Sequence, residues 1–413
     1  MTASACRRRP DCRLCGGTDL ELALQLAPTP PANEFVRSPD VVQERFPLDV
    51  FTCLACGHAQ LRDVVDPRRL FEQYVYVSGT SPVFVDHFRR YAEALSREVG
   101  LATGDLVVDV GSNDGTLLRF FADAGQRVQG VDPARAIAEE ATRRGLPTEA
   151  AFFTPALAAD LRARLGPARV VTANNVFAHV DDLGGVADGV RALLAPDGLF
   201  AFEVSYLVDV VEKTLFDTIY HEHVAYHAVK PLVPFLRAHG LELIDAVRVD
   251  THGGSLRGVA QLAGGPRAVR PSVAAAVAHE EALGLDRPAR LRAFGEDIER
   301  KGARLREVLA AERAAGRRVA GFGAPAKATT LMHHFRLGRD EVEFIVDDSP
   351  LKQGLYTPGL HVPVVSSSAL AERRPDTLLI LAWNFAGPIM AKQRAFAEAG
   401  GRFVVPLPEV EVH

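Results

Sequence analysis

The sequence predicts an α/β protein built in three parts. Two Cys-x-x-Cys pairs lie near the start of the chain, which indicates a small module folded around a metal ion. Two later stretches alternate apolar strand patterns with helical patterns, an order typical of doubly wound α/β domains with parallel sheets. We therefore expect a metal-binding module over 1–70, a doubly wound domain over 71–270 and a second α/β domain over 271–413.

Composition narrows the class of protein. The chain has 413 residues, too many for one ordinary core, and 47% hydrophobic with 24% charged residues is ordinary for a globular protein. The formal net charge of −5 gives no basic field for a nucleic-acid backbone. No apolar run reaches the ~18–20 residues of a membrane span, and the Arg-rich start, Met1 to Arg13, lacks the apolar stretch of a secretory signal. We expect a cytoplasmic protein that binds neither nucleic acid nor membrane.

The first part carries the cysteines. Four of the five form the close pairs Cys12/Cys15 and Cys53/Cys56, whereas Cys6 stands apart. A Cys-x-x-Cys turn presents two thiolates to a tetrahedral Zn²⁺, and a glycine follows each pair, where such a turn uses a positive φ. Four buried free cysteines are the bland alternative, and the repeated Cys-x-x-Cys-Gly pattern speaks against it. We expect one structural zinc with four thiolate ligands.

The secondary structure follows from short apolar runs and from glycine and proline breaks. A proline-rich link over 28–31 cannot be helical. In the middle part the expected elements are a helix over Pro82–Val99, a strand over Leu106–Val110, a helix start over Gly115–Arg119, and strands over Val128–Val131, Val170–Thr172 and Leu199–Val204. In the last part they are a helical stretch over Val273–Ala315, broken near Gly284 and Pro288, and strands over Arg318–Phe322, Phe344–Asp347 and Thr377–Ala382.

A glycine-rich segment over 109–115 follows the first strand of the middle part. Its glycines let the backbone approach a ligand, and a helix N-terminus stands behind it. The spacing is not that of a pyrophosphate-binding turn, and Asp132 ends the next strand, where a carboxylate accepts ribose hydroxyls. These acids suit a ribose and a sulfonium, so we expect S-adenosylmethionine; a tight structural turn is the alternative. The expected cofactor-binding residues are Asp109, Gly111, Ser112, Asn113, Asp114, Gly115, Asp132, Phe153, Asn174 and Asn175.

Two further clusters contain titratable side chains. His179 follows a later strand of the same sheet, at the edge where open α/β sheets collect ligands, although a lone histidine is as often structural. The run over 220–227 holds Tyr220, Glu222 and His223, and an imidazole beside a phenol and a carboxylate is a candidate general base. A polar surface loop is the alternative for this run.

Two glycine turns are candidate anion sites. The turn that starts at His252-Gly253 and ends at Arg257 offers backbone N–H groups and a guanidinium, and a plain hairpin turn is the alternative. The turn over 321–327 follows a strand and ends in Lys327, which suits a phosphate; the alternative is a tight strand-to-helix turn with a solvated lysine. Asp347 ends the next strand, where an acid would meet a ribose or a base.

As an ordered set, these motifs resemble the sugar C-methyltransferases that act on nucleotide-linked 4-keto deoxysugars in antibiotic sugar pathways. The similarity extends over nearly all of the chain and rests on the Cys-x-x-Cys-Gly pairs, the segment 110–117, Phe202-Glu203-Val204, the cluster at 220–223, His252-Gly253-Gly254, and the turn over 321–327. The resemblance implies a zinc-binding front domain, a central Rossmann-like methyltransferase domain and a C-terminal Rossmann-like domain, with the sugar held between the last two. It implies methylation of C3, or in a few members C5, of a dTDP-4-keto-deoxysugar.

The resemblance also implies roles for single residues. His223 would be the base that removes the proton next to the ketone, and Tyr220 and Glu222 would orient it or the substrate. His179 would donate to the developing enolate oxygen, and Tyr74 or Tyr76 would contact the sugar. The substrate-binding set would be His252, Gly253, Arg257, Lys327 and Asp347.

Two other functions stay open at this point. A nicotinamide-dependent nucleotide-sugar oxidoreductase would use the glycine turn over 321–327 for its cofactor. A zinc-ribbon RNA-modifying methyltransferase would use the front module, against which the acidic net charge speaks. We expect a monomer or a weak homo-oligomer.

Overall fold

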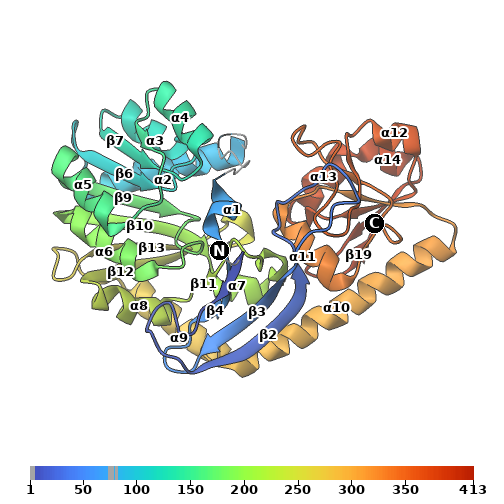
Figure 1. Cartoon of the computed structure of the whole chain (residues 1–413), viewed down its shortest axis with the longest axis horizontal. Helices are drawn as coiled ribbons and strands as arrows, with labels where there is room; N and C mark the ends of the chain where they lie inside the picture. The colour runs from blue at the N-terminus through green and yellow to red at the C-terminus, as the bar shows by residue number, and fades with distance from the viewer. Residues whose placement is uncertain (1–4, 73–78, 80–81) are drawn as a thin grey trace. The chain divides into compact units, whose positions relative to one another are not determined.

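The computed structural model describes residues 5–72, 79 and 82–413, and it divides into two compact units that are each described by themselves (Figure 1). Unit 1 comprises Met1–Glu21, Thr52–Val208 and Val224–Arg287, and unit 2 comprises Leu22–Phe51, Asp209–His223 and Pro288–His413. The division into domains over 1–70, 71–270 and 271–413 stays a prediction.

A seven-stranded sheet in the order β12-β13-β10-β9-β6-β7-β8 is the centre of unit 1. Its strands are β6 (Leu106–Val110), β7 (Arg127–Val131), β8 (Thr148–Glu149), β9 (Ala168–Asn174), β10 (Leu194–Ser205), β12 (Leu241–Val249) and β13 (Ser255–Leu262). β6 lies between the parallel strands β7 and β9 and is buried along its full length. Burial on both faces explains why it is a continuous apolar run with a single acid.

The expectation of a parallel sheet is wrong at one edge. β13 pairs antiparallel with both β10 and β12. β12 and β13 are joined by a short connection that contains the 3₁₀ helix η3 (Thr251–Gly253). Parallel neighbours need a crossover of a dozen or more residues, so this connection permits only a hairpin. The sheet is therefore mixed, and the glycine turn at 252–254 forms the hairpin connection.

Helices cover both faces of this sheet. They are α2 (Pro82–Val99), α3 (Thr116–Asp123), α4 (Arg135–Arg143), α5 (Pro155–Leu165), α6 (Leu183–Leu193), α8 (Val229–Ala238) and α9 (Pro271–Leu283). In Figure 1, α3 and α4 lie on one side of the strands and α6 and α8 on the other. α2 has the expected bounds because Phe88, Tyr91 and Leu95 recur at helical spacing and pack in one hydrophobic cluster with β6 and α3.

The front module is built mainly of antiparallel strands. β1 (Cys6–Arg8) pairs antiparallel with β5 (Asp63–Val65), and α1 (Pro67–Phe71) follows. A separate sheet has the order β11-β4-β3-β2, with β2 (Leu20–Thr29), β3 (Phe46–Cys53), β4 (Ala59–Leu61) and β11 (Ala225–Tyr226). β2 and β3 each contribute residues to both units, as does α7 (Leu207–Glu212). The proline-rich link is non-helical, as predicted.

Unit 2 has its own α/β sheet, in the order β16-β15-β14-β17-β18-β19. Its strands are β14 (Val319–Phe322), β15 (Ile345–Val346), β16 (Val364–Val365), β17 (Thr377–Ile380), β18 (Arg402–Val405) and β19 (Glu411–Val412). Its helices are α10 (Pro288–Ala314), α11 (Ala326–Phe335), α12 (Ala369–Arg373), α13 (Ala386–Lys392) and α14 (Arg394–Glu398), with 3₁₀ turns η2 (Phe216–Thr218) and η4 (Trp383–Phe385). Pairing is parallel up to β18, and β19 returns antiparallel.

The predicted interruption of the long helical stretch is confirmed. α9 ends at Leu283, and Gly284 caps it with a φ of +67° in the left-handed region that glycine adopts readily. α10 then begins at Pro288. Among the helices that the structure describes, none is long and apolar enough to cross a membrane.

Candidate active site and metal centre

The four paired cysteines converge in unit 1, where their sulfur atoms all lie within 4.8 Å of one another. The Sγ atoms of Cys12 and Cys56 are 3.6 Å apart, and so are those of Cys15 and Cys53. Disulfide sulfurs would be about 2 Å apart, whereas thiolates bonded to tetrahedral Zn²⁺ at about 2.3 Å lie about 3.8 Å from one another. The donor set therefore fits a four-thiolate zinc ion that these residues would hold.

The backbone at each pair has the conformation that a metal knuckle needs. Gly16 has a φ of +70° and donates its N–H to the Cys12 carbonyl at 3.0 Å. Gly57 has a φ of +81° and donates to the Cys53 carbonyl at 2.8 Å. The predicted positive φ values are thus confirmed.

The glycine-rich loop leaves the carboxyl end of β6 and runs into α3. The N–H groups of Gly111 and Ser112 donate to the Val131 carbonyl at 2.7 and 3.2 Å, which ties the loop to β7. Gly111 has a φ of +68°, and a Cβ there would lie 2.1 Å from Cγ2 of Val176. Gly115 caps α3 with a φ of +76°. Tight-turn geometry therefore accounts for part of this motif, whatever ligand the loop binds.

Asp132 stands at the carboxyl end of β7 and holds the same loop. Its Oδ2 accepts the N–H of Asn113 and its Oδ1 accepts the N–H of Ala134, both at 2.9 Å. Burial raises the pKa of Asp132, and the two N–H groups oppose that shift. A carboxylate has about four lone-pair positions, so this side chain can hold the loop and still accept hydroxyl groups.

Asp109 lies inside β6, where the Thr172 hydroxyl donates to its Oδ1 at 2.6 Å. Burial raises the pKa of Asp109 to about 7; the Thr172 hydrogen bond opposes the shift and the Asp132 charge adds to it. Strongly perturbed carboxyl groups concentrate at functional sites. Asp109 and Asp132 therefore lie close to the carboxyl ends of the neighbouring strands β6 and β7.

Buried polar atoms to which the described residues offer no hydrogen-bond partner also lie at the carboxyl ends of strands in this sheet. Both amide atoms of Asn174, the last residue of β9, and the hydroxyl oxygen of Ser112 are buried without a hydrogen-bond partner among the described residues. Buried polar groups in native proteins are nearly always hydrogen-bonded. Together with Asp132, these atoms offer donors and acceptors for the ribose and amino-acid groups of S-adenosylmethionine, so the residues present fit that cofactor.

Three other predicted cofactor residues have defined partners within unit 1. Oδ1 of Asp114 accepts the hydroxyl of the first residue of α3 at 2.7 Å. The ring of Phe153 packs on α6, since a Cβ on Gly189 would lie 2.8 Å from it. Asn175 has a φ of +55° and donates its N–H to the Glu203 carbonyl at 2.7 Å. Whether these residues also contact the cofactor stays a prediction.

His179 lies in the loop between β9 and α6 and is partly buried. Its N–H donates to the Val176 carbonyl at 2.8 Å. Its ring meets the ring of Phe71 edge-on, with 5.5 Å between centroids. The structure therefore places His179 in the loop that directly follows Asn174, with its backbone and its ring both held.

Glu203 of β10 is the centre of a charged cluster in which only Arg257 was predicted as a site residue. Oε2 of the buried Glu203 lies 2.8 Å from Nε2 of His87, and its Oε1 accepts Nε of Arg257 at 2.6 Å. The Arg257 guanidinium stands over the Tyr91 ring at 4.1 Å. Burial opposes ionisation, yet His87 and Arg257 together lower the pKa of Glu203 below its ordinary value. Glu203 pairs with Asn174 across the strands, so the cluster borders the cofactor edge.

The run of titratable residues over 220–223 lies in unit 2 and has no helical conformation. Nδ1 of His223 lies 2.7 Å from the carbonyl oxygen of Thr218. The rings of His223 and Tyr220 stack at a tilt, with centroids 4.4 Å apart. Glu222 is buried and accepts Nδ2 of Asn33 at 2.8 Å. The run is therefore an ordered, half-buried cluster and not the polar surface loop that was the alternative interpretation.

Lys327 is not a solvated lysine. It lies in the first turn of α11 in unit 2, and its Nζ lies 3.7 Å from Oδ2 of Asp217 and 4.2 Å above the Trp383 ring. Trp383 donates its indole N–H to the same carboxylate oxygen at 2.6 Å. Burial lowers the pKa of Lys327, and Asp217 opposes that shift. Asp347 is likewise engaged, since it accepts the N–H of Ala324 at 2.6 Å.

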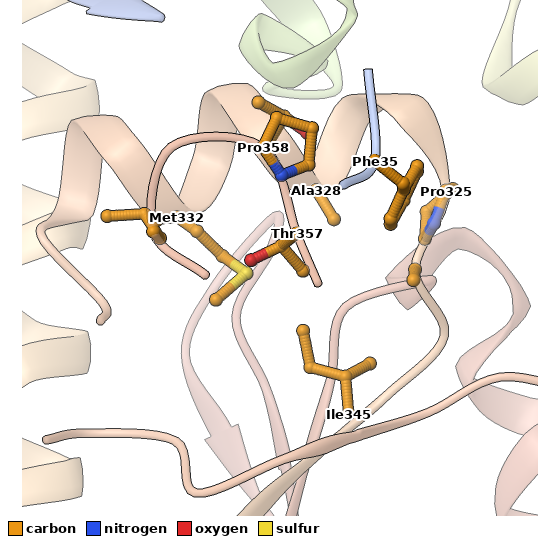
Figure 2. A pocket seen from close by; sticks show the side chains of 10 residues that line it. Phe35, Pro325, Ala328, Met332, Ile345, Thr357 and Pro358 are labelled. Carbon is orange, nitrogen blue, oxygen red and sulfur yellow. The ribbon is translucent and has the colours of Figure 1, made fainter. Parts of the chain in front are cut away.

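A small apolar hollow adjoins this turn in unit 2 (Figure 2). Phe35, Met332 and Ile345 are among the side chains that line it. Its volume of about 10 Å³ is room for a single water molecule, not for a nucleotide base.

Some predicted residues lie outside what the structure describes. Tyr74 and Tyr76 fall in the undescribed segment 73–78. For His252 only the backbone, in η3, is described, and the neighbouring Gly253 has a φ of +93°.

Comparison with known proteins agrees with this architecture. Three family models match successive parts of the chain: "Putative zinc binding domain" over 12–71, "Methyltransferase domain" over 85–246, and "C-methyltransferase C-terminal domain" over 250–408. Fold, cofactor edge and cysteine cluster thus define an S-adenosylmethionine-dependent methyltransferase with a zinc-binding front module. C-methyltransferase NovU from Streptomyces niveus is 40% identical over 404 residues, which cover 97% of this chain and 96% of NovU. The chain belongs to the C-methyltransferase family.

Solved structures match more remotely. An S-adenosylmethionine-dependent methyltransferase from Clostridium acetobutylicum shows 15% identity over 44% of this chain and 92% of its own, with a TM-score of 0.36. Magnesium protoporphyrin IX methyltransferase from Synechocystis shows 18% identity over 43% of this chain and 80% of its own, with a TM-score of 0.32. At these TM-scores neither likeness carries an argument about the site.

Proposed function

We propose that the protein methylates C3 of a dTDP-4-keto-deoxysugar, next to the ketone, in the biosynthesis of an antibiotic sugar. Family membership supports transfer to carbon. The sugar and its position rest on the resemblance of the ordered motifs. Transfer to carbon requires a carbon nucleophile, which a 4-keto sugar supplies once a base removes the proton next to the ketone.

The orientation of the His223 ring is the observation that carries this proposal. A neutral imidazole has one donor and one acceptor nitrogen. Because Nδ1 faces the Thr218 carbonyl at 2.7 Å, Nδ1 carries the hydrogen and Nε2 carries the basic lone pair. The stacked Tyr220 ring restrains the plane of the imidazole. His223 is therefore held as a base that accepts a proton at Nε2.

Glu222 would orient the base, and His179 would stabilise the product of deprotonation. Glu222 is buried and fixed by Asn33, so it can orient Tyr220, His223 or the substrate. His179 would donate to the enolate oxygen. Donors fixed in place before reaction are often the largest single contribution to rate.

S-adenosylmethionine supplies an electrophilic methyl group when bound. In the proposal the loop over 111–115, Asp132 and Asn174 bind and orient it: Asp132 accepts the ribose hydroxyls, and the unsatisfied amide of Asn174 pairs with the cofactor's polar groups. Asp109, with its raised pKa, limits negative charge in the sheet below.

The remaining assignments concern the nucleotide sugar. Its binding is proposed for Arg257, Lys327, Asp347 and the His252-Gly253 turn, with Tyr74 or Tyr76 on the sugar. Arg257 and Lys327 each bring a cation already paired with one buried acid, which keeps the guanidinium and ammonium oriented. We also propose that the enzyme acts in the cytoplasm as a monomer or weak homo-oligomer.

Incubation with S-adenosylmethionine and a dTDP-4-keto-deoxysugar, followed by mass spectrometry of the nucleotide sugar, tests the proposal. The expected product carries one additional methylene mass, and His223→Asn forms it far more slowly. An unmethylated sugar at full cofactor saturation would reject the substrate class. Family membership favours methyl transfer over the oxidoreductase alternative, and the acidic net charge speaks against RNA as a substrate.

A further inference from the structure

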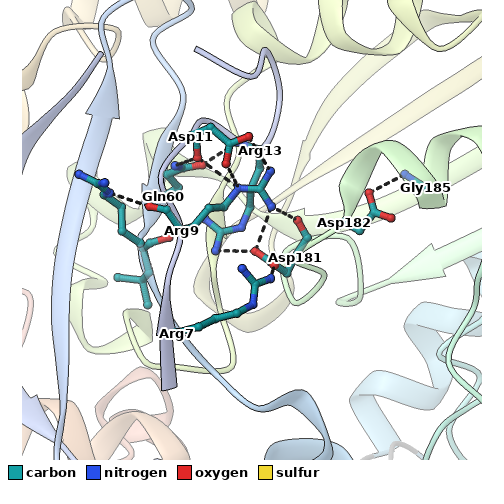
Figure 3. A network of polar contacts seen from close by, with 10 residues as sticks. Arg7, Arg9, Asp11, Arg13, Gln60, Asp181, Asp182 and Gly185 are labelled. Atoms are coloured by element: carbon teal, nitrogen blue, oxygen red, sulfur yellow. Dashed lines mark hydrogen bonds and ion pairs between the residues drawn. The ribbon is translucent and has the colours of Figure 1, made fainter. Parts of the chain in front are cut away.

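Three arginines from the start of the chain meet one aspartate (Figure 3). The side chains of Arg7, Arg9 and Arg13 all form ion pairs with Asp181; the Arg9 and Arg13 contacts with Oδ1 measure 3.3 and 3.0 Å. Arg9 also donates to the Asp181 carbonyl oxygen at 2.9 Å. The carboxylate of Asp181 thus forms ion pairs, and its backbone carbonyl accepts a hydrogen bond. These contacts restrain both the side chain and the backbone at this position.

The arginine cluster lies close to a candidate catalytic residue. Asp181 closely follows His179 in the loop between β9 and α6, and the side chain of Arg13 beneath it is fully buried. A buried guanidinium is costly unless it is paired. The fold therefore retains a costly buried cation at the loop that carries a candidate catalytic residue.

The arginines are held by the metal module. Arg13 lies inside the first Cys-x-x-Cys turn, and its N–H donates to Oε1 of Gln60 at 2.9 Å. Nε2 of Gln60 donates to the Asp11 carbonyl at 3.0 Å. Arg9 donates its backbone N–H to the carbonyl of Arg62, which lies between β4 and β5, at 2.7 Å, and its own carbonyl accepts Nε of Arg62 at 2.8 Å. Zinc at the four thiolates would fix this turn and with it the guanidinium groups.

The same module holds the His179 loop at two more points. The Ala178 carbonyl accepts the N–H groups of Val224 and Ala225 at 2.9 and 3.2 Å, and Ala225 belongs to β11, which pairs with β4 of the module. The ring of Phe71, at the end of α1, contacts the His179 ring. The front module thus contacts the His179 loop at three points: the Ala178 carbonyl, the His179 ring and the Asp181 carboxylate.

We propose that the zinc module acts as a clasp that positions the His179 loop, with Arg9, Arg13 and Asp181 as positioning residues. This gives the structural metal a part in catalysis without an open coordination position. The kinetic consequence rests on the proposed function, whereas the clasp itself does not. A charge cluster that only adds stability to the front module is the competing explanation.

Full-length, zinc-loaded Asp181→Asn is compared with Asp182→Asn. Asp182 is a matched control because it accepts the Gly185 N–H at 2.9 Å as the cap of α6, and asparagine caps helices equally well. Amide hydrogen exchange over residues 174–182 is the primary measurement. We expect Asp181→Asn to speed exchange there by about tenfold with the rest of the sheet unchanged, and Asp182→Asn to match wild type. Unchanged exchange in Asp181→Asn overturns the clasp.

Kinetics separate positioning from stability. In Asp181→Asn we expect kcat for methyl transfer to fall about 10–100-fold, while zinc content and the Kd for S-adenosylhomocysteine stay at wild-type values, and Asp181→Glu to recover part of kcat. A lower melting temperature with unchanged local exchange and kcat supports the purely structural explanation and overturns ours. Faster local exchange with unchanged kcat supports the clasp and rejects the role of His179 instead.

A second variant serves if Asp181→Asn fails to fold. Arg9→Gln removes one guanidinium of the three, and its side chain is 18% exposed, so the loss of a fully buried charge is avoided. We expect a smaller rise in exchange confined to the same peptide. Exchange that rises equally across the seven-stranded sheet would contradict the clasp.

Discussion

Nδ1 of His223 lies 2.7 Å from the carbonyl oxygen of Thr218, and this contact determines which ring nitrogen is basic. A neutral histidine whose Nδ1 donates to a fixed carbonyl presents Nε2 as its acceptor. The backbone of the η2 turn thus does for His223 what a carboxylate does in other catalytic histidines: it selects the tautomer.

Replacement of His223 by asparagine should slow proton removal and leave cofactor binding intact. General-base contributions are commonly ~10²–10⁴-fold, and we expect kcat to fall within that range. With S-adenosylhomocysteine in heavy water, wild-type enzyme should exchange the sugar proton next to the ketone, and His223→Asn should not. Exchange at the wild-type rate in the variant would place the base elsewhere, with His179 and Tyr220 as the next candidates.

The cysteine cluster predicts one zinc per chain. Cys12→Ser should lose most of the metal and lower the melting temperature, because the remaining thiolates no longer complete a tetrahedral shell. Cys6→Ser is the matched control, since Cys6 lies in β1 outside the cluster. Elemental analysis with thermal unfolding measures both effects; full zinc content in Cys12→Ser would show that the ligand assignment is wrong.

Asp132→Ala should weaken binding of S-adenosylhomocysteine by about tenfold or more, because it removes a charge-assisted acceptor and frees the loop at Asn113. Asp123→Ala, at the exposed end of α3, controls for charge in the same unit. Calorimetric titration compares the two variants. Equal affinities in Asp132→Ala and wild type would exclude Asp132 from the cofactor site.

The raised pKa of Asp109 predicts that the free energy of unfolding depends on pH. Its pKa is about 7 in the folded protein against an ordinary 3.8. The folded state therefore binds this proton more tightly, so the contribution is most favourable below pH 4 and is lost as pH rises toward 7. Asp109→Asn removes that slope and should gain about 2–4 kcal/mol relative to wild type between pH 4 and pH 8. Urea unfolding at both pH values measures the difference; parallel pH curves for the two proteins would contradict it.

Local sequence patterns were sufficient for most of the central sheet. The helix over Pro82–Val99 and the strand over Leu106–Val110 have the predicted bounds, because a helical apolar stripe and a fully buried strand are each set by their own residues. The direction of β12 and β13 depends on which strands pair, and the alternation pattern does not contain that information. The antiparallel edge was missed for this reason.

Ion pairs between residues far apart in the chain could not be predicted from local sequence patterns either. His87 and Glu203 lie far apart in the chain, and no spacing rule joins them. One signal was available: a carboxylate in the apolar strand Phe202-Glu203-Val204 needs a buried partner. The arginines at the start of the chain gave a similar signal, because an Arg-rich stretch beside a metal knuckle requires acidic partners once Arg13 is buried.

The position of the transferred methyl group can be measured with S-adenosylmethionine labelled with ¹³C in its methyl group and a dTDP-4-keto-deoxysugar. Nuclear magnetic resonance of the product locates the label. We expect a methyl carbon bonded to C3 of the sugar, with loss of the proton that C3 carried. A label on oxygen or nitrogen, or a carbon-bound label at a position not adjacent to the ketone, would contradict this expectation.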